Sequence, residues 1–559
     1  MINVYDFEVF KYDWLVVIAN PVRKEEIVIV NDPEKLRAVY EERKDEIWVG
    51  YNSRHYDSFI MTAILTDRNP KTINDAIIAG NRWPLNKVKL YDYDVRNSLD
   101  PSLKTFEAYL GESIKESSVP FDIDRKLTAG EIAEVIEYCK HDVSNTLQVF
   151  IERKKDFDAH LQMINMFNLP LKYISKTKVQ LAAIILEAED SGDRLDEFDL
   201  IFPKNLRINK YTDCIDFYKN TDNHNYNSKL KIDIAGVPHV LGWGGLHGAL
   251  EKYFGTGFYV NVDVASYYPT LMIKNGYTSR NMKYPKKYEE LYRLRLKYKA
   301  EKNPLQAPLK IVLNGTYGAM KDPYNALYDP RMANNVCVSG MLYLVDLIEK
   351  LEPHFQIIQS NTDGILVKIF PKDFELLDDI CYEWEQRTGM ELEFSFFEKV
   401  FQKDVNNYVI VDKDGNYKSK GAYVKKLGKL DYDLPIVNEC LVNWFLLGKT
   451  PEETVLECNE LIKFQKVVRV TRNYKYALYN GKPLSERTFR VFASTRESDG
   501  LIQKCKGEGK NPEKFANTPF HCFIENGNLE NVSVPPHLDK NYYVELAKKR
   551  LTDFGVRNV

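Results

Sequence analysis

NTDGILV, residues 361–367, places an aspartate in a polar turn immediately before an apolar strand. The apolar runs on either side, HFQIIQS and ILVKIF, predict a hairpin with this turn at its tip. An Asp-Gly pair alone is ordinary turn chemistry. However, a second carboxylate, Asp263, ends the apolar strand GFYVNVDV 100 residues upstream of Asp363. Two carboxylates at strand ends predict a site that can share divalent metal ions.

Length and composition indicate several domains with ordinary cores, because the chain has 559 residues, of which 44% are hydrophobic and 13% aromatic. No apolar run is long enough to cross a bilayer, and the N-terminal MINVYDFEVF has the pattern of a strand rather than of a leader. The eight cysteines are scattered without a Cys-x-x-Cys pair, which argues against a zinc ribbon or a disulfide framework. We therefore expect a cytoplasmic protein without a membrane partner.

Basic residues gather in three stretches, although the net charge is only −3. Residues 280–310 hold ten basic and three acidic residues, whereas KSKGAYVKKLGK (418–429) and KFQKVVRVTRNYK (463–475) each hold five basic residues and no acid. Charge runs are commonly solvated faces. Here tyrosines interleave them, which favours contact with a nucleic-acid backbone and stacking on bases.

The N-terminal region carries its own carboxylates, within a pattern that predicts strands at 2–10, 14–20, 26–30 and 46–52 and a long helix towards residue 155. Asp6 and Glu8 are two apart on the first strand and so share a face, which is either a metal-binding face or the polar face of an edge strand. Asp57 follows in a polar turn, and Tyr138 lies four residues before Asp142 on one face of the helix. Four carboxylates could bind two divalent cations, while the tyrosine orients a water for phosphodiester hydrolysis.

Six segments in this order resemble motifs of family B DNA polymerases. Asp-x-Glu, Asn-x-x-x-Tyr-Asp and Tyr-x-x-x-Asp resemble the three proofreading exonuclease motifs. NVDVASYYPT, KIVLNGTYG (310–318) and NTDG resemble three polymerase motifs, and the set covers about residues 5 to 365. The resemblance implies template-directed DNA synthesis with 3′-5′ proofreading, primer-template DNA and dNTPs as partners, and two Mg²⁺ ions per active site, with Mn²⁺ as the alternative.

The fold implied by the resemblance is α/β and multi-domain, with an N-terminal ribonuclease-H-like exonuclease followed by a right-hand polymerase of palm, fingers and thumb. We expect a monomer, and we leave open that accessory replication proteins bind it. The expected regions are an exonuclease domain at 1–165, a linker and template-binding region at 166–255 with irregular backbone, a palm at 256–430 with fingers inserted at about 282–325, and a thumb with the C-terminal region at 431–559.

The resemblance also assigns roles to residues. Asp263 and Asp363, with the carbonyl of Val264, are the polymerase metal ligands, and Asp6, Glu8, Asp57 and Asp142 are those of the exonuclease, where Tyr138 orients the water. Tyr268 excludes a 2′-hydroxyl, Lys310 holds the triphosphate and Tyr317 lines the nascent base pair. Asn314, near the same helix face, is a further nucleotide-binding residue. From the facing helix, Arg293 with Lys297, or in the other register Arg295 with Lys299, projects cations, and we favour the first pair. The DNA-binding residues are Asn52, Tyr56, Gly244, Gly245, Thr362, Lys403 and Tyr408.

Three positions depart from the family pattern. Asn361 replaces the first aspartate of Asp-Thr-Asp, although Asp363 keeps the essential second one. Asn406 stands where a primer-contacting lysine is usual, which leaves Lys403 as a substitute, and Gly242 replaces the tyrosine of a Tyr-x-Gly-Gly segment.

The spacing of the polymerase motifs is short, at 47 residues from Asp263 to Lys310 and 53 from Lys310 to Asp363. This spacing favours a compact phage-type enzyme, which would act in the host cytoplasm. Two alternatives stay open, namely a ribonuclease-H-like nuclease without polymerase activity and a catalytically dead DNA-binding protein.

Overall fold

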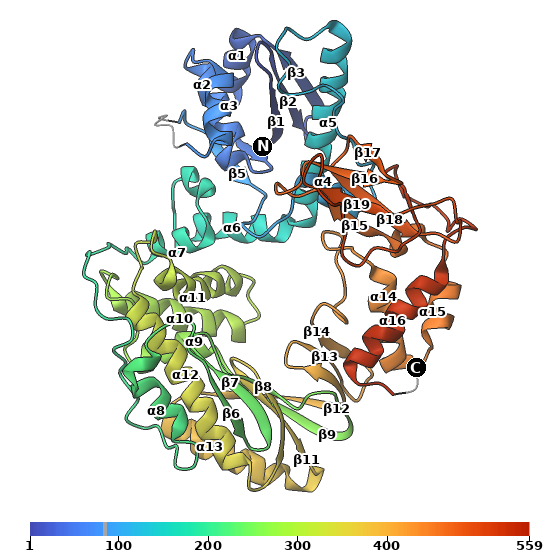
Figure 1. Ribbon diagram of the computed structural model, residues 1–559. Coiled ribbons are helices and arrows are strands. Elements are labelled where there is room, and N and C mark those ends of the chain that lie inside the picture. Colours follow the sequence, from blue (N-terminus) through green and yellow to red (C-terminus); the bar gives the residue numbers. More distant parts are fainter. Residues whose placement is uncertain (82–86, 558–559) are drawn as a thin grey trace. The chain divides into compact units, whose positions relative to one another are not determined.

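The computed structural model describes residues 1–81 and 87–557 and is a mixed α/β protein (Figure 1). The described residues form two compact units. The first unit comprises residues 1–176, 427–437 and 452–546, and the second comprises residues 177–426, 438–451 and those from 547 onwards. Each unit therefore contains segments that are distant in the sequence.

A five-stranded sheet lies at the centre of the N-terminal part of the first unit, in the order β3-β2-β1-β4-β5. The strands β1 and β2 and the strands β2 and β3 pair antiparallel, whereas β4 is parallel to both β1 and β5. The expected N-terminal strands are confirmed within one or two residues at each end. Their bounds are β1 (Ile2–Val9), β2 (Trp14–Asn20), β3 (Glu25–Val30) and β4 (Ile47–Gly50). The fifth strand, β5 (Tyr91–Asp94), was not predicted from the sequence.

The central strand β1 is buried along most of its length because helices cover both faces of the sheet. Figure 1 shows α5 on one face and α2 with α3 on the other. A capping box fixes the start of α5, since Thr128 accepts from the backbone N–H of Glu131 and the Glu131 carboxylate accepts from that of Thr128. The helices here are α1 (Pro33–Arg43), α2 (Asp57–Leu65), α3 (Pro70–Ile78), α4 (Leu103–Leu110), α5 (Ala129–Glu152) and α6 (Lys154–Met166).

Two small antiparallel sheets from the C-terminal part of the chain complete the first unit, in the orders β15-β18-β21 and β17-β16-β19-β20. The sheet β15-β18-β21 packs on α4 through β15 and β18, and β18 carries Arg490, whose side chain is fully buried. Its guanidinium donates to the carbonyls of Glu112 at 2.7 Å and Glu525 at 3.1 Å and to that of Gly527. The strands are β15 (Lys466–Arg469), β16 (Tyr476–Tyr479), β17 (Lys482–Leu484), β18 (Thr488–Ala493), β19 (Ile502–Cys505), β20 (Glu513–Lys514) and β21 (Cys522–Ile524).

The second unit is built on a nine-stranded antiparallel sheet in the order β14-β13-β12-β9-β11-β10-β8-β7-β6. The long helix α12 (Pro330–Leu351), almost wholly buried, packs against β11 and β6 of this sheet. The strands are β6 (Leu230–Ile234), β7 (Val237–Leu241), β8 (His247–Ala249), β9 (Tyr253–Val264), β10 (Gln356–Ser360), β11 (Gly364–Ile369), β12 (Leu392–Asp404), β13 (Asn407–Val411) and β14 (Tyr417–Lys420).

Residues 165–255 are more regular than the sequence led us to expect, because β6, β7 and β8 extend the large sheet at one edge. Buried and exposed residues alternate along β7, whose sequence is Val-Pro-His-Val-Leu. Because the strand contains a proline and its buried centre is a histidine, the sequence does not show the usual strand pattern. The expected hairpin around residues 361–364 is confirmed as β10 and β11.

Helices α10 and α11 pack against each other in the second unit, and α11 also packs against α7. The helices of this unit and of the C-terminal region are α7 (Lys178–Ile185), α8 (Asp213–Lys219), α9 (Tyr267–Lys274), α10 (Pro285–Ala300), α11 (Gln306–Lys321), α12 (Pro330–Leu351), α13 (Phe374–Thr388), α14 (Pro435–Leu447), α15 (Pro451–Glu457) and α16 (Lys540–Phe554). Among the described residues, no helix combines the length and the apolar character that a bilayer crossing requires.

We predict that Arg490→Met lowers the free energy of unfolding of the first unit by on the order of 3 kcal/mol, because several buried carbonyls lose their donors. Arg496→Met is the matched control, since Arg496 is exposed and its side chain has no hydrogen bond among the described residues. It should change stability by less than about 0.5 kcal/mol. Scanning calorimetry of both variants tests this, and equal transitions in the two would contradict the role given to Arg490.

Candidate functional sites

The antiparallel pairing of β9 with β11 brings the two predicted carboxylates together. In this register Asp263 lies directly opposite Gly364, and the backbone N–H of Val264 donates to the carbonyl of Asp363 at 2.8 Å. Both carboxylates line one cavity of about 840 Å³, which we call the carboxylate cavity. Asp363 is exposed at its surface, whereas Asp263 is half-buried.

Because Gly364 has no side chain, the Asp263 carboxylate can occupy the space next to it. A Cβ atom at residue 364 would lie 2.0 Å from Asp263 Oδ1, far inside van der Waals contact. The side-chain amide of Asn261 donates to the other oxygen, Oδ2, at 2.6 Å and so holds that oxygen in place. Burial raises the pKa of Asp263, the hydrogen bond from Asn261 lowers it, and the neighbouring charge of Asp363 raises it further.

The donors in the carboxylate cavity suit a divalent cation. Asp263 and Asp363 supply carboxylate oxygens, and the side-chain oxygen of Asn361 is buried there without a hydrogen-bond partner among the described residues. An all-oxygen donor set of this kind fits Mg²⁺ or Mn²⁺. The residues that would hold the ion are therefore the two aspartates, with the amide oxygen of Asn361 and the carbonyl of Val264 beside them.

Polar and basic side chains form the walls of the carboxylate cavity. Of the residues predicted for nucleotide and DNA binding, those that line it are Val264, Tyr268, Lys310, Asn314, Thr362 and Tyr408. Tyr317 is not among the lining residues, but its ring lies 4.5 Å from that of Tyr268. The lysines of β14, Lys418 and Lys420, line the cavity as well, although only their membership of a basic stretch marked them in the sequence.

The favoured register on α10 was wrong for this cavity. Arg295 and Lys299 line it, whereas Arg293 and Lys297 do not and have side chains that are 75% and 67% exposed. Arg295 is buried and donates to Ser266 Oγ at 2.5 Å, and Lys299 pairs with Glu393 at 2.7 Å. The buried residues of α10 are Tyr288, Leu291 and Arg295, at spacings of three and then four residues. This buried face includes Arg295 and turns Arg293 and Lys297 outwards.

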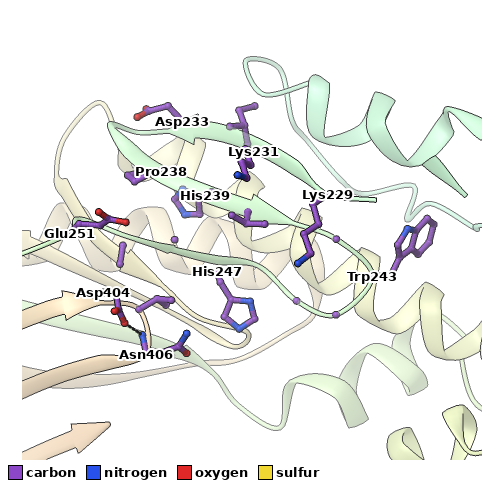
Figure 2. Close-up of a pocket in the computed structure, with 18 of the residues that line it drawn as sticks. Lys229, Lys231, Asp233, Pro238, His239, Trp243, His247, Glu251, Asp404 and Asn406 are labelled. Atoms are coloured by element: carbon purple, nitrogen blue, oxygen red, sulfur yellow. Dashed lines mark hydrogen bonds between the residues drawn. The ribbon is translucent and has the colours of Figure 1, made fainter. Parts of the chain in front are cut away.

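The predicted glycines of the GWGG segment lie at a different cavity, of about 880 Å³, which we call the glycine-loop cavity. Gly244 and Gly245 line it, and Figure 2 shows Lys229, Lys231 and His247 around it. Lys403 lines neither cavity. Its ammonium lies 3.6 Å from Asp404 and 4.8 Å from the centre of the Tyr423 ring.

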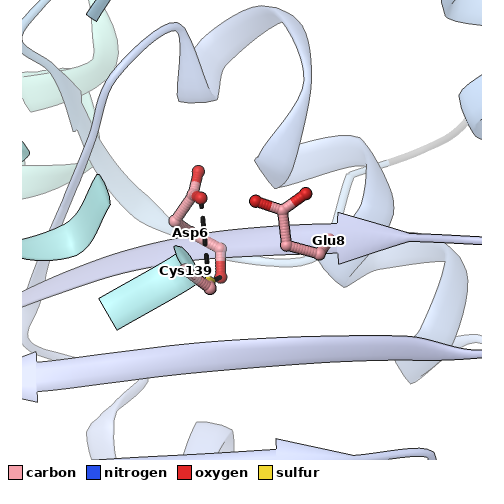
Figure 3. Close-up of side chains that lie close together, drawn as sticks. All are labelled: Asp6, Glu8 and Cys139. Carbon is pink, nitrogen blue, oxygen red and sulfur yellow. Dashed lines mark hydrogen bonds between the residues drawn. The ribbon is translucent and has the colours of Figure 1, made fainter. Parts of the chain in front are cut away.

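The first unit brings together Asp6, Glu8, Asp57 and Asp142, which we call the N-terminal carboxylate cluster. Figure 3 shows Asp6 and Glu8 on β1 with Cys139 from α5 beside them, and one ligand atom of each of these three lies within 4.8 Å of the others. Asp57 Oδ1 accepts from the backbone N–H of Phe7, between the two acids of β1, at 3.1 Å. Asp142 is paired with Lys104, which the sequence did not single out.

Burial and mutual repulsion raise the pKa values of these carboxyl groups above those of exposed carboxyl groups. Burial raises the pKa of Asp6 and of Glu8, and the charges of Asp57 and Asp142 respectively add to the effect. Burial likewise raises the pKa of Asp57 to about 8 and, against the opposing charge of Lys104, that of Asp142 to about 6. Four crowded carboxylates with a single lysine fit the binding of divalent cations, whose charge offsets the repulsion.

Of the remaining predicted residues of the first unit, Tyr138 and Tyr56 lie near the carboxylates of this cluster. The ring of Tyr138 packs under the Lys104 ammonium at 4.3 Å, and burial raises its pKa. Asn52 has a left-handed backbone, with φ of 67°, and its side-chain oxygen accepts from Arg96 at 2.8 Å. The Tyr56 hydroxyl donates to Asn74 at 2.7 Å.

Sequence comparisons relate the chain distantly to archaeal DNA polymerases. It is 24% identical over 220 residues to DNA polymerase 1 of Saccharolobus solfataricus, covering 36% of this chain and 24% of that protein. It is 29% identical over 128 residues to DNA polymerase 1 of Aeropyrum pernix, covering 22% and 13%. The matches thus span a quarter or less of these relatives' lengths. No family model matches the chain.

A structural comparison aligns the whole chain with 78% of the family B DNA polymerase of Pyrobaculum calidifontis, with a TM-score of 0.45 and 15% sequence identity.

We predict that the metal-free first unit becomes less stable as the pH rises from about 4 towards 8. Asp142 and Asp57 hold protons up to about pH 6 and 8, where the unfolded chain has already released them. The folded state then binds more protons, so the free energy of unfolding falls with rising pH. Thermal unfolding at a series of pH values measures this, and Asp57→Asn should flatten the fall between pH 6 and 8. A stability that is independent of pH would contradict the assignment.

We predict that Gly364→Ala weakens Mn²⁺ binding in the carboxylate cavity by about tenfold, because the added Cβ displaces the Asp263 carboxylate. The measurement is a Mn²⁺ titration followed by electron paramagnetic resonance, with Asp6→Ala and Asp57→Ala present to remove the other cluster. Gly318→Ala is the control, since a Cβ there meets nothing within 4 Å. Equal affinity in the two variants would show that Gly364 does not set the position of Asp263.

Proposed function

We propose that this chain is a DNA-directed DNA polymerase of the family B type with a 3′-5′ proofreading exonuclease. The observation that carries the proposal is the carboxylate cavity, which Asp263 on β9 and Asp363 directly before β11 line together with Lys310, Arg295 and Lys299. Paired carboxylates opposite a basic wall suit a reaction between a nucleotide triphosphate and a primer end. The distant similarity to archaeal DNA polymerases supports the same activity.

Polymerisation forms a bond between the primer 3′-oxygen and the α-phosphorus, while the bond from that phosphorus to the leaving pyrophosphate breaks. When bound by Asp263 and Asp363, divalent cations supply stabilisation of the negative charge on the reacting oxygens. Lys310, Arg295 and Lys299 hold the triphosphate oxygens and offset their charge. Binding in this way aligns the α-phosphate with the primer end.

Tyr268 is the residue we assign to sugar selection. Its ring is half-buried at the cavity and packs against Tyr317, and both hydroxyls contact Cys337. A ring held from behind in this way leaves little room for a 2′-hydroxyl. Asn314 and Tyr317 lie on the same helix, α11, as Lys310 and would line the nascent base pair.

The N-terminal carboxylate cluster is the proposed exonuclease site. The order β3-β2-β1-β4-β5, with two parallel strands beside an antiparallel meander, supports a ribonuclease-H-like arrangement there. Asp6, Glu8, Asp57 and Asp142 would hold the cations, and Tyr138 would orient the attacking water. Lys104 pairs with Asp142 and also with Glu107, so it balances part of the charge of Asp142.

Template and primer contacts are assigned to Gly244 and Gly245 at the glycine-loop cavity, to Thr362 and Tyr408 at the carboxylate cavity, and to Asn52 and Tyr56 near the exonuclease site. Lys403 is still assigned to DNA binding, but as a contact that lies outside both cavities. The palm would be the large sheet, the fingers α10 with α11, and the short motif spacing supports a compact phage-type enzyme.

We predict that the protein, given a labelled primer-template and Mg²⁺, extends the primer with dNTPs and shortens its 3′ end without them. Asp363→Ala should reduce extension at least about a hundredfold and spare shortening, whereas Asp6→Ala should do the reverse. Asp378→Ala and Asp122→Ala are controls, since both side chains are exposed and outside the two sites.

Two results would contradict the proposal. Shortening without extension under all nucleotide conditions indicates a nuclease alone, and neither reaction, with DNA binding retained, indicates a DNA-binding protein without catalysis.

A further inference from the structure

A third cavity, of about 650 Å³, lies wholly within the first unit and is lined by four arginines. Arg96 belongs to the N-terminal part of the unit, and Arg469, Arg472 and Arg487 come from the β15–β18 region. We call it the arginine cavity. Two of these arginines belong to the basic stretch 463–475, which no part of the proposed active sites uses.

None of the four arginines has a carboxylate within ion-pairing distance in the described parts of the chain. Arg487 is fixed by donating to four backbone carbonyls, those of Val470, Thr471, Tyr474 and Lys475, at 3.1–3.3 Å. Arg96 donates to the Asn52 side chain. The cavity therefore gathers four guanidinium groups without a direct ion pair to any described residue, and the nearby opposite charge is the Glu116 carboxylate, which accepts from the backbone N–H of Arg487 at 2.9 Å.

Arg469 and Arg472 are exposed, and their side chains have no hydrogen bond or ion pair among residues 1–81 and 87–557. Although the Arg469 side chain reaches solvent, partial burial of its guanidinium lowers its pKa, the positive charges of Arg487 and Arg96 lower it further, and the Glu116 carboxylate opposes this shift. Like charges held this close repel one another and are stabilised when an anion binds between them. The guanidinium fork matches phosphate oxygens in particular.

The arginine cavity adjoins the N-terminal carboxylate cluster along the chain. Asn52 lines the cavity, and five residues later Asp57 belongs to the cluster. Leu103 also lines it, and the next residue, Lys104, is paired with Asp142 of the cluster. An anion that occupies the cavity thus lies beside the two backbone segments that carry residues of the proposed hydrolytic site.

We propose that the arginine cavity binds the phosphodiester backbone of single-stranded DNA and feeds its 3′ end to the N-terminal carboxylate cluster. The inference rests on the proposed exonuclease function for its purpose, but binding itself requires no hydrolysis. The volume suits a few nucleotides of one strand rather than a duplex. Tyr51 also lines the cavity, its hydroxyl bonded to Pro101 O at 2.5 Å and its ring edge-to-face with Phe106, which gives a base a fixed surface to contact.

Arg469 and Arg472 are the residues to change, because neither side chain has a partner whose loss would unfold the protein. The double variant Arg469→Gln/Arg472→Gln is compared with Arg496→Gln, an exposed arginine of the same unit that lies outside the cavity. All proteins carry Asp6→Ala to block hydrolysis. Fluorescence anisotropy of a labelled single-stranded oligodeoxynucleotide in EDTA gives the affinity at several salt concentrations.

We predict that the double variant binds this oligonucleotide at least about tenfold more weakly, while Arg496→Gln binds as the parent does. The slope of log affinity against log salt should fall by about 1.4, because two phosphate contacts are lost. An unchanged affinity and slope would overturn the proposal. So would full displacement of the DNA by inorganic phosphate or a dNTP at millimolar concentration, since that result indicates a small-anion site.

The same two arginine variants with Asp6 intact separate this proposal from the exonuclease assignment. If the parent shortens a single strand, the double variant should raise KM about tenfold with little change in kcat, whereas an effect on kcat alone contradicts a role in binding the strand. If the parent shortens no DNA, the exonuclease proposal fails, and the anisotropy measurement still decides whether the arginine cavity binds DNA.

Discussion

The close approach of Asp263 to Gly364 across β9 and β11 is the constraint on which the carboxylate cavity depends. The strand register fixes which residues face each other, and only a residue without a side chain leaves room for the aspartate. Asn261 then holds the second carboxylate oxygen. The backbone therefore determines the position of this carboxylate, and the cations and substrate meet a site that needs little rearrangement.

Electrostatic repulsion is managed differently in the two units. In the second unit, lysines and an arginine surround the two aspartates, so the cavity presents both signs of charge. In the first unit, the carboxylates are crowded and buried beside a single lysine, and the cationic residues gather instead in the arginine cavity. Burying several carboxylates without a bound cation raises the free energy of the folded state, so a cation that binds there is stabilising. The separate basic cavity attracts the polyanion on which such a cluster would act.

Much of the candidate chemistry could be predicted from the sequence, because aspartates at strand ends and on helix faces follow short-range periodicity. Asp6 and Glu8 share a face of β1 for this reason, and Asp263 and Asp363 meet because both end or begin paired strands. Arg295 with Lys299 was named only as the less favoured register, because the choice depends on which face of the helix is buried, and Tyr288 with Leu291 was the available signal. Lys104, Cys139 and the arginine cavity depend on contacts between distant segments, which no local pattern reveals.

Arg490 has a consequence for how the protein is made. Its side chain donates to the carbonyl of Glu112, 378 residues earlier in the chain, so the first unit is completed only when residues near its C-terminal end are available. At about 5–20 residues per second, ribosomal synthesis separates the two partners by roughly 20–75 s. During that interval the end of α4 is exposed to water and to other proteins. The N-terminal sheet must therefore hold its shape on its own, or be protected by a chaperone, until the last strands arrive.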